Sequence, residues 1–188
     1  MNYIVPHFTL PKLHKDAATM SFENYWKIRK IYKEILGLEG IDHFSMNIAD
    51  PEQKISVFSY TPSILCNLLE SGLYRYNGVM SPTYYQQLDF FSWEQCYDMR
   101  FSEIMKTQME RRFKITFGFS LVRKIADFHV VYVFATRGSK MALLEKIVDK
   151  SHFFQMGDHV YELLRGVYSQ YAEMYYPPSL RLESSIEK

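Results

Sequence analysis

The chain has 188 residues, 47% of them hydrophobic, which suits one domain with a substantial core. Its 22 basic and 21 acidic residues leave a net charge of +1, so the charge balance does not point to a nucleic-acid-binding surface. No apolar run approaches the roughly 20 residues of a membrane helix, and Cys66 and Cys96 lack metal or redox spacing, so we expect a cytoplasmic protein without a membrane span.

The first third of the chain predicts an α-β-β arrangement. Residues 1–20 have two prolines and scattered apolar side chains, which predicts an N-terminal arm that is extended or partly ordered. Residues 22–36 have apolar positions at helical spacing, with Ser21 as the cap and Gly37 as the stop. The strand-like runs 43–50 and 54–60 are joined by a polar turn and predict a β-hairpin.

The central part of the chain predicts helices and loops. Residues 63–71 form a short predicted helix that Gly72 ends, and Ser81 followed by Pro82 marks the start of another. Residues 101–112 are apolar on one side and charged on the other. This pattern predicts an amphipathic helix packed on the opposite edge of the sheet.

The last third predicts a second hairpin followed by helix. Residues 111–123 and 128–137 are strand-like, and a short turn over 124–127 connects them. From Ser139 the apolar spacing becomes helical, as either one long helix or two, until Pro177-Pro178 ends it. The apolar residues of this region either pack on the core or form the contact surface of a homodimer.

These elements predict an α+β fold: an α-β-α sandwich around a central, mainly antiparallel sheet of four or five strands. We expect an arm over 1–20, one domain over 21–176, and a linker or tail over 177–188.

Three positions of the central segment have the spacing of a known family. Pro62, Tyr74 and Trp93 fall at the intervals found in the signal-binding (autoinducer-binding) domain of LuxR-type quorum-sensing regulators. The stretch FGFSLVRKIADFHVVYVFAT, residues 117–136, also resembles that family's glycine-containing strand, turn and last core strand. The resemblance covers roughly residues 21–175.

The departures from the family pattern carry chemical information. Leu65 stands where the family pattern has its first tryptophan, and Leu69 where it has its first tyrosine. Gly78-Val79 stands where the pattern has the Asp-Pro pair. In the family, that tryptophan donates to the lactone carbonyl of an acyl-homoserine lactone, and the aspartate accepts the amide N–H. Leucine and glycine side chains do neither, and a buried amide without its partner costs about 1–3 kcal/mol. We therefore expect a more apolar signal, a different head group, or no ligand.

The resemblance implies a set of ligand-contacting residues. Tyr74 and Trp93 combine an aromatic ring with one polar group, and Leu65 and Leu69 occupy the altered slots. The remaining candidates lie on the predicted strands, where alternation turns only some of them inward: Phe58, Tyr60, Phe117, Phe134 and Thr136. Each of the aromatic candidates is equally compatible with an ordinary core position.

Catalytic and metal chemistry finds little support. His152 and His159 are seven residues apart, whereas helical metal ligands usually stand three or four apart, and Asp158 alone does not complete a site. Cys96 and His129 have no catalytic signature around them, and no glycine-rich phosphate loop is present. We expect no enzyme activity, no metal and no cofactor.

The leading hypothesis is the ligand-sensing domain of a LuxR-type transcription regulator that binds an apolar small-molecule signal and forms a homodimer. Contact with DNA would come only through a helix-turn-helix domain that this sequence does not contain, and the direction of regulation stays open. The basic residues Arg111, Arg112, Lys114, Arg123 and Lys124 form either a solvated strand end or a minor contact to phosphates. The alternative is a ligand-independent dimerisation or protein-interaction module, with Leu65 and Leu69 filling the space of the ligand head.

Overall fold

The computed structural model describes residues 8–172 and 174–180, and within them the chain forms one open six-stranded sheet in the order β1-β3-β2-β6-β5-β4. The strands are β1 (Lys12–Leu13), β2 (His43–Ala49), β3 (Lys54–Ser59), β4 (Phe90–Ser92), β5 (Phe117–Ile125) and β6 (Phe128–Thr136). Strand β1 runs parallel to β3, and the other neighbours are antiparallel. The predicted α+β class is confirmed. The prediction of four or five strands was too low, because β1 and β4 are too short to show a strand pattern.

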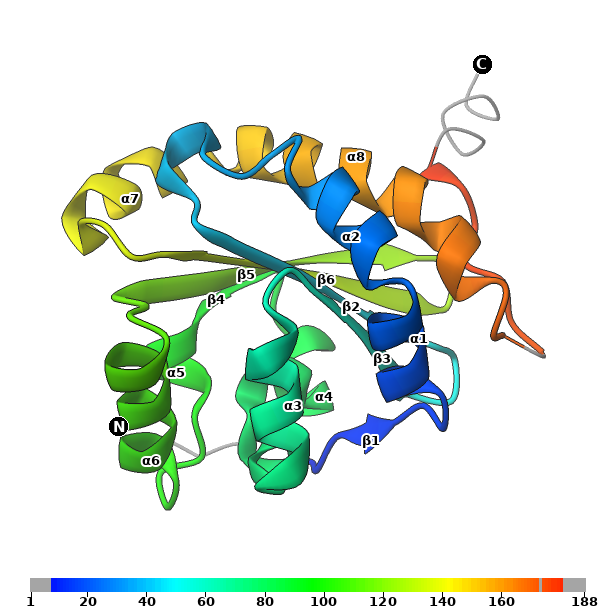
Figure 1. Ribbon diagram of the computed structural model, residues 1–188, viewed down its shortest axis with the longest axis horizontal. Coiled ribbons are helices and arrows are strands. Elements are labelled where there is room, and N and C mark those ends of the chain that lie inside the picture. The colour runs from blue at the N-terminus through cyan, green and yellow to red at the C-terminus, as the bar shows by residue number, and fades with distance from the viewer. Residues whose placement is uncertain (1–7, 173, 181–188) are drawn as a thin grey trace.

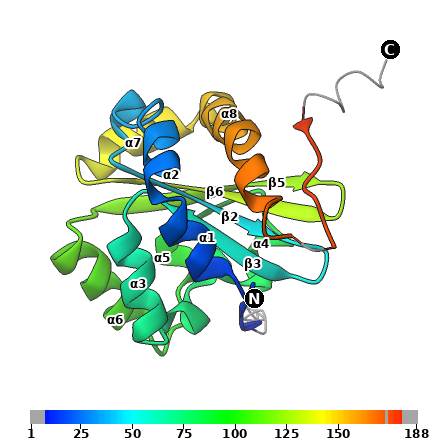
Figure 2. The same ribbon diagram turned by 45° about the vertical axis from the view of Figure 1, so that its right-hand side comes forward.

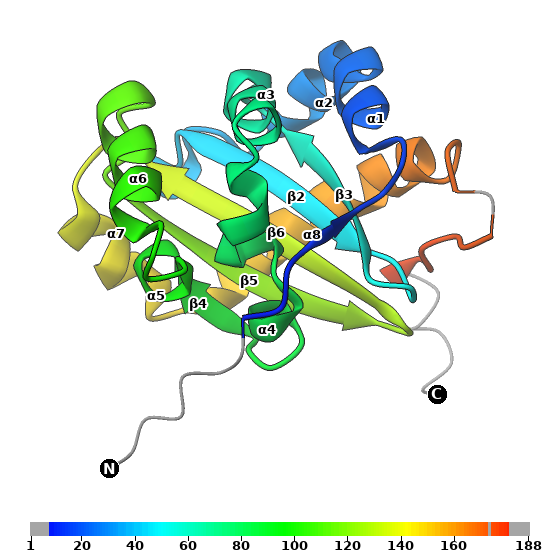
Figure 3. The ribbon, with the colours of Figure 1, turned by 90° about the horizontal axis from the view of Figure 1, so that it is seen from below.

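Helices cover both faces of the sheet (Figure 1). One face carries α2 (Tyr25–Tyr32), α7 (Lys140–Ile147) and α8 (Lys150–Tyr168), and α1 (Ala17–Glu23) packs beside β3 (Figure 2). The other face carries α3 (Pro62–Glu70), α4 (Pro82–Tyr85), α5 (Trp93–Cys96) and α6 (Ser102–Thr107) (Figure 3). Short turns complete the layers: the 3-10 helices η1 (Leu38–Gly40), η2 (Leu73–Tyr76) and η3 (Gly78–Met80), and the π-helical turn η4 (Gln108–Arg112). The predicted sandwich is confirmed.

The two long inner strands set the frame of the sheet. Strands β5 and β6 pair in a continuous antiparallel ladder from Phe117↔Thr136 to Ile125↔Phe128. Their turn is Ala126-Asp127, with Ala126 at φ +50°. The predicted turn over 124–127 was therefore too long, because β5 continues through Ile125 and the two residues between the strands suffice for a hairpin.

The core on the α8 face is aromatic. Phe134 lies with its ring centroid 4.9 Å from Phe44, 5.2 Å from Phe119 and 5.5 Å from Phe153 of α8. All four rings are fully buried. Ring pairs at these distances add to the free energy of burial, so this cluster is a main stabilising element of the α8 layer.

The α8 helix is fixed on the sheet by close packing and by one polar group of residues. A Cβ atom on Gly157 would lie 2.1 Å from the ring of Tyr132, so the helix backbone rests directly on that ring. Beside it, the Asp158 carboxylate accepts from the Arg123 guanidinium at 2.8 and 3.1 Å and from the Tyr132 hydroxyl at 2.8 Å. These contacts set the position of α8 along the strands.

Several predicted boundaries need correction. The helix predicted over 22–36 is two helices, α1 and α2, which meet at Asn24. Of the two arrangements predicted after Ser139, one long helix or two, the structure has two, since the Asp149 side chain accepts the Ser151 N–H at 2.9 Å and starts α8 anew. Helix α8 ends at Tyr168, well before Pro177.

The predicted terminal segments lie partly outside the described residues. Of the arm predicted over 1–20, residues 1–7 are outside, and the described part contains β1 and the start of α1. Of the tail predicted over 177–188, residues 181–188 are outside. Within the described residues, no helix is long and apolar enough to cross a bilayer.

Candidate functional site

A cavity of about 50 Å³ lies between the sheet and the α3 layer. It is lined by strand residues, α3 residues and the connections that follow α3: His43, Ser45, Asn47, Val57, Ser59, Ile64, Leu65, Leu68, Asn77, Val79, Met80, Trp93, Tyr97, Met109 and Val133. One water needs roughly 10–15 Å³ on this kind of measure, so the space admits a few water-sized groups. We call it the α3 cavity.

The floor of the α3 cavity is polar because of the alternation of β2. His43, Ser45 and Asn47 face the cavity, while Phe44, Met46 and Ile48 between them join the aromatic core on the opposite face. Across the ladder, Ser45 pairs directly with Ser59 of β3, which adds another hydroxyl. A buried strand with one polar face is unusual and marks a surface meant to meet polar groups.

Some polar groups of the floor have partners within the protein. His43 Nδ1 lies 3.0 Å from Thr61 Oγ1, and Ser59 Oγ donates to the Thr61 carbonyl at 3.1 Å. The Asn47 amide donates to the Val79 carbonyl at 3.4 Å. These bonds hold the floor against the start of α3 and against η3.

Other polar atoms of the floor are unused. Among the described residues, no hydrogen bond joins the Ser45 hydroxyl, the Asn47 side-chain oxygen or His43 Nε2 to the protein. Burial, with the nearby charge of Arg137 as a smaller cause, lowers the pKa of His43 to about 4, so its ring is neutral near pH 7. The floor therefore offers neutral donors and acceptors without a charge.

The wall of the α3 cavity is apolar. Helix α3 starts at Pro62 after the Thr61 cap, and its apolar spacing turns Ile64, Leu65 and Leu68 toward the sheet. Met109 of η4 closes the wall on the side of α6. An apolar wall opposite a polar floor suits a molecule with one polar and one apolar side.

Trp93 of the lining combines burial with an unused donor. Its side chain is 7% exposed, and its indole N–H has no hydrogen-bond partner within the part of the chain that the structure describes. The ring lies flat on β5, since a Cβ atom on Gly118 would come within 2.3 Å of it. A buried unpaired N–H is costly, so a ligand acceptor at this position would relieve that cost.

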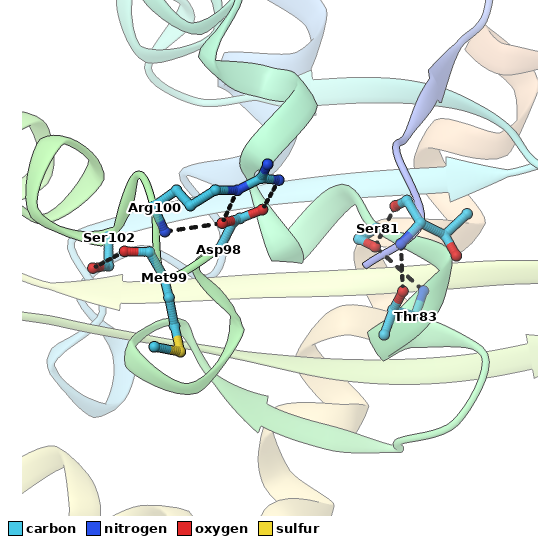
Figure 4. Close-up of polar contacts among 7 residues, drawn as sticks. Ser81, Thr83, Asp98, Met99, Arg100 and Ser102 are labelled. Carbon is cyan, nitrogen blue, oxygen red and sulfur yellow. Dashed lines mark hydrogen bonds and ion pairs between the residues drawn. The ribbon is translucent and has the colours of Figure 1, made fainter. Parts of the chain in front are cut away.

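Polar contacts fix the connections that border the α3 cavity (Figure 4). Ser81 Oγ donates to the Thr9 carbonyl at 2.6 Å and Thr9 N–H donates to Thr83 Oγ1 at 2.8 Å, which ties the N-terminal segment to the end of η3. After Tyr97, the Asp98 carboxylate accepts from the Arg100 guanidinium at 2.8 and 3.1 Å. These contacts therefore hold in place the two connections that carry lining residues.

A pair of polar contacts, which we call the Asn67 clasp, joins α3 to η4 beside the α3 cavity. The Asn67 amide donates to Gln108 Oε1 at 3.0 Å, and the Arg112 guanidinium donates to Asn67 Oδ1. Both bonds lie at or near the surface, where hydrogen bonds are weaker than in the core. The α3 layer is therefore held to η4 by contacts that can open.

The structure brings together only part of the predicted site. Leu65 and Trp93 line the α3 cavity. Leu69 and Tyr74 are half-buried against the same core but are not in the lining, and the Tyr74 hydroxyl accepts from Arg75 Nε at 3.4 Å.

The strand candidates mostly face away from the cavity. Phe58, Phe117 and Phe134 belong to the core under α8, Tyr60 packs against that core, and Thr136 donates to Asp42 at 3.3 Å. Phe117 also borders a space of about 30 Å³ on the far side of Trp93. Both faces of the sheet are buried, so aromatic content alone did not tell which face holds a cavity. The signal that was missed is the polar alternation at His43, Ser45 and Asn47.

The other chemistries considered from the sequence do not assemble into sites among the described residues. Cys96 donates to the Trp93 carbonyl at 3.4 Å, and burial raises the pKa of its thiol, which opposes a nucleophilic role. His152 pairs with Glu39 at 3.6 Å and His159 with Glu34 at 2.7 Å, so the two imidazoles have separate partners. The basic residues divide likewise: Arg112 contacts α3, whereas Arg123 contacts α8.

A larger space, about 290 Å³, lies at the sheet edge between β1 and the end of α8. It is lined largely by polar, charged and tyrosine side chains, among them Asp50, Glu52, Lys54, Tyr168 and Tyr175. An apolar molecule bound here would take charged side chains out of water without giving them a partner, which is unfavourable. We regard the smaller α3 cavity, whose lining has no Asp, Glu, Lys or Arg, as the candidate site.

No protein-family model matches the chain, and no curated protein sequence matches it. Solved structures do match. One is Escherichia coli SdiA, with a TM-score of 0.53 and 12% identity over 89% of this chain and 74% of that one. Another is SdiA in complex with octanoyl-rac-glycerol, with a TM-score of 0.51 and 13% identity over 87% of this chain and 67% of that one. The chain therefore shares the α+β fold of SdiA.

Proposed function

We propose that this chain is the ligand-sensing domain of a LuxR-type transcription regulator and that it binds an apolar small molecule in the α3 cavity. The observation that carries the proposal is the cavity itself, with its polar floor, apolar wall and unpaired Trp93 N–H, inside a fold shared with SdiA. That SdiA has been solved with octanoyl-rac-glycerol supports a lipid-like molecule as the kind of ligand.

The slots that would meet an acyl-homoserine lactone differ in chemistry here. Leu65 lines the α3 cavity where the family pattern has a tryptophan, and Gly78 stands where the pattern has the aspartate. Neither side chain can hydrogen-bond a lactone or an amide. We therefore propose a signal other than a standard acyl-homoserine lactone.

The small size of the cavity suggests how a ligand would act. An alkyl chain needs more room than about 50 Å³, so binding must move the α3 layer apart from η4 and complete the core on that face. A ligand that binds only the folded form stabilises it by about 2.7 kcal/mol at a hundredfold excess over its dissociation constant. Occupancy would then set the amount of folded, dimeric protein in the cytoplasm and the placement of a DNA-binding helix-turn-helix domain.

The alternative function is a ligand-independent dimerisation or protein-interaction module. The limited volume of the α3 cavity favours it, because Leu65 and Leu68 already occupy part of the space. Exposed apolar side chains are present as well: Trp26 is 77% exposed and Val148 is 87% exposed. Single apolar residues are common on surfaces, so they support a partner only weakly.

The test is mass spectrometry of the protein purified from its native host, under native conditions and again after denaturation. We expect a stoichiometric small molecule that denaturation releases. Leu68→Trp, which fills the α3 cavity, should abolish its retention, whereas Leu69→Trp, outside the lining, should keep it.

A bare polypeptide mass, together with a melting temperature that saturating cell extract leaves unchanged, would reject the sensor. Size-exclusion chromatography then separates the alternatives further. A dimer that forms equally with and without extract supports the interaction module, and a dimer that needs extract supports the sensor.

A further inference from the structure

We infer that the space of about 290 Å³ between β1 and the end of α8 binds a small aliphatic amine, whose ammonium group contacts Asp50 and Tyr168. We call this space the edge site. Its lining shares no residue with that of the α3 cavity, so the inference goes beyond the proposed function and does not depend on it.

Three segments that are distant in the sequence build the edge site. One follows β1, one is the turn between β2 and β3, and one is the end of α8 with the chain after it (Figure 1). The His14 N–H donates to the Ile55 carbonyl at 2.9 Å, and the Asp50 N–H donates to the Lys54 carbonyl at 3.0 Å. The sheet therefore holds the first two segments in place, and the site is large enough for a small molecule as it stands.

Asp50 supplies a buried carboxylate that the protein uses only in part. The residue is 4% exposed, and its Oδ1 accepts the Lys54 backbone N–H at 2.8 Å. Among the described residues, no hydrogen bond reaches Oδ2. A buried charge without enough partners is unfavourable, so a donor from a ligand would stabilise it.

The lysines of the lining already have partners. The Lys54 ammonium contacts the Glu52 carboxylate and not Asp50, and Lys15 has an interaction of its own. The two charges of the Glu52–Lys54 pair offset each other. Asp50 is therefore the charge of the lining that a ligand cation would complement.

Tyr168 supplies the second polar contact. The residue is 1% exposed, and its hydroxyl has no hydrogen-bond partner within the part of the chain that the structure describes. Burial, with the nearby charge of Asp50 as a smaller cause, raises the pKa of Tyr168, so the hydroxyl stays protonated close to the carboxylate. Its oxygen can accept from the same ammonium group that donates to Asp50.

The rest of the lining suits the aliphatic body of an amine. Two more tyrosine rings and three apolar side chains border the site: Tyr171, Tyr175, Leu13, Ala172 and Met174. Tyrosine rings attract cations and also pack on methylene groups. No group of three or more His, Cys, Asp or Glu side chains that could hold a metal ion is present in the described residues, so we expect an organic cation.

Three compounds of equal chain length test this chemistry. Pentylamine is a cation at pH 7, 1-pentanol is neutral, and pentanoate is an anion. Titration calorimetry of the full chain should give saturable binding of pentylamine. The other two compounds should bind roughly tenfold more weakly or worse, because hydrogen bonds between charged groups are stronger than neutral ones.

Substitutions assign the contacts. Asp50→Asn removes the charge but keeps an oxygen for the Lys54 N–H, and it should weaken pentylamine binding by about tenfold while leaving 1-pentanol unchanged. Tyr168→Phe keeps the ring and should weaken pentylamine binding a few-fold. Asp127→Asn is the matched control, because it removes the same charge from an exposed turn at the same end of the sheet, outside the lining. It should leave the affinity unchanged.

Several results would overturn the edge site. They are an absence of saturable pentylamine binding, pentanoate binding that is as tight, or an equal effect of Asp127→Asn and Asp50→Asn. If Asp50→Asn does not fold, Tyr168→Phe decides alone, and an unchanged affinity rejects the site. Leu68→Trp, which fills the α3 cavity, should bind pentylamine like the wild type, so failure of the edge site and failure of the proposed sensor are distinguishable.

Discussion

The contact between Gly118 and Trp93 is the most sensitive single contact of the candidate site. Gly118→Ala would place a methyl group within 2.3 Å of the indole, so the ring must leave its seat on β5. We expect a loss of about 1–3 kcal/mol in the free energy of unfolding, because overpacking forces side chains from their rotamers. In a Trp26→Phe background, the emission of Trp93 should shift to the red.

Ser120→Ala is the control for that substitution, because Ser120 lies two residues along β5 on the same buried face, outside the lining. It should change neither the emission nor the melting temperature appreciably. Unchanged emission in Gly118→Ala would show that Trp93 does not rest on the strand.

His43 makes the stability of the fold depend on pH. Its pKa is about 4 in the folded protein, against about 6.5 in an unfolded chain, so the unfolded state binds the proton more tightly. The contribution of neutral His43 is complete above pH 6.5, falls as the pH drops below that value, and levels off below pH 4. Between pH 7 and pH 4.5 we expect roughly 2–3 kcal/mol of loss from this residue.

Urea unfolding of the wild type and of His43→Gln at both pH values isolates this effect. The wild type should lose more stability on acidification than the variant does. His159→Gln is the control, because the His159 side chain is 47% exposed beside Glu34. Identical losses in the wild type and in His43→Gln would contradict the buried, neutral imidazole.

Among the elements, α8 offers a matched pair of glycines. A Cβ on Gly157 would meet the Tyr132 ring at 2.1 Å, whereas a Cβ on Gly166 would meet nothing within 4 Å. Gly157→Ala should therefore destabilise the protein by about 1–3 kcal/mol, since the helix must lift from the sheet. Gly166→Ala should stabilise it by up to about 1 kcal/mol through helix propensity. Thermal unfolding of the two variants measures the difference, and equal shifts would refute the close packing of α8.

The elements that follow local rules were predictable from sequence. Gly72 ends α3 with φ +70°, and Ser81 caps α4 by accepting the Thr83 N–H. These signals depend on neighbouring residues alone. The start of α8 at Asp149 carried a similar signal, but the continuous apolar stripe allowed one helix as well as two.

The candidate site was only partly predictable because it depends on which sheet face holds a cavity. Leu65 and Trp93 were named from spacing, and both line the α3 cavity. Phe58 and Phe134 were named for their strands, yet the register turns them to α8. Register and layer order come from contacts that are distant in sequence, which no local pattern contains.

For the whole molecule, the two helical layers should differ in stability. The α8 layer has the aromatic cluster and the Arg123–Asp158–Tyr132 contacts, whereas the α3 layer has a cavity, a π-helical turn and the Asn67 clasp. Hydrogen exchange should therefore be slow in α8 and faster in α3, α6 and η4, because regions with few buried contacts open more readily. Asn67→Ala should speed exchange over 108–112. The control Cys66→Ala, at the preceding position, should not. Equal protection of the two layers would contradict this ordering.

The shortness of the sheet edges has a consequence for how the chain behaves in a crowded solution. The segment FHVVYVFAT is β-branched, aromatic and nearly uncharged, the composition of segments that stack into fibrils. In the fold it is the interior strand β6, paired on both sides, while the edges are β1 with two residues and β4 with three. Such edges present few free backbone groups to a foreign strand. The aggregation hazard of this segment is thus confined to the unfolded chain, so any molecule that stabilises the folded state would also lower that hazard.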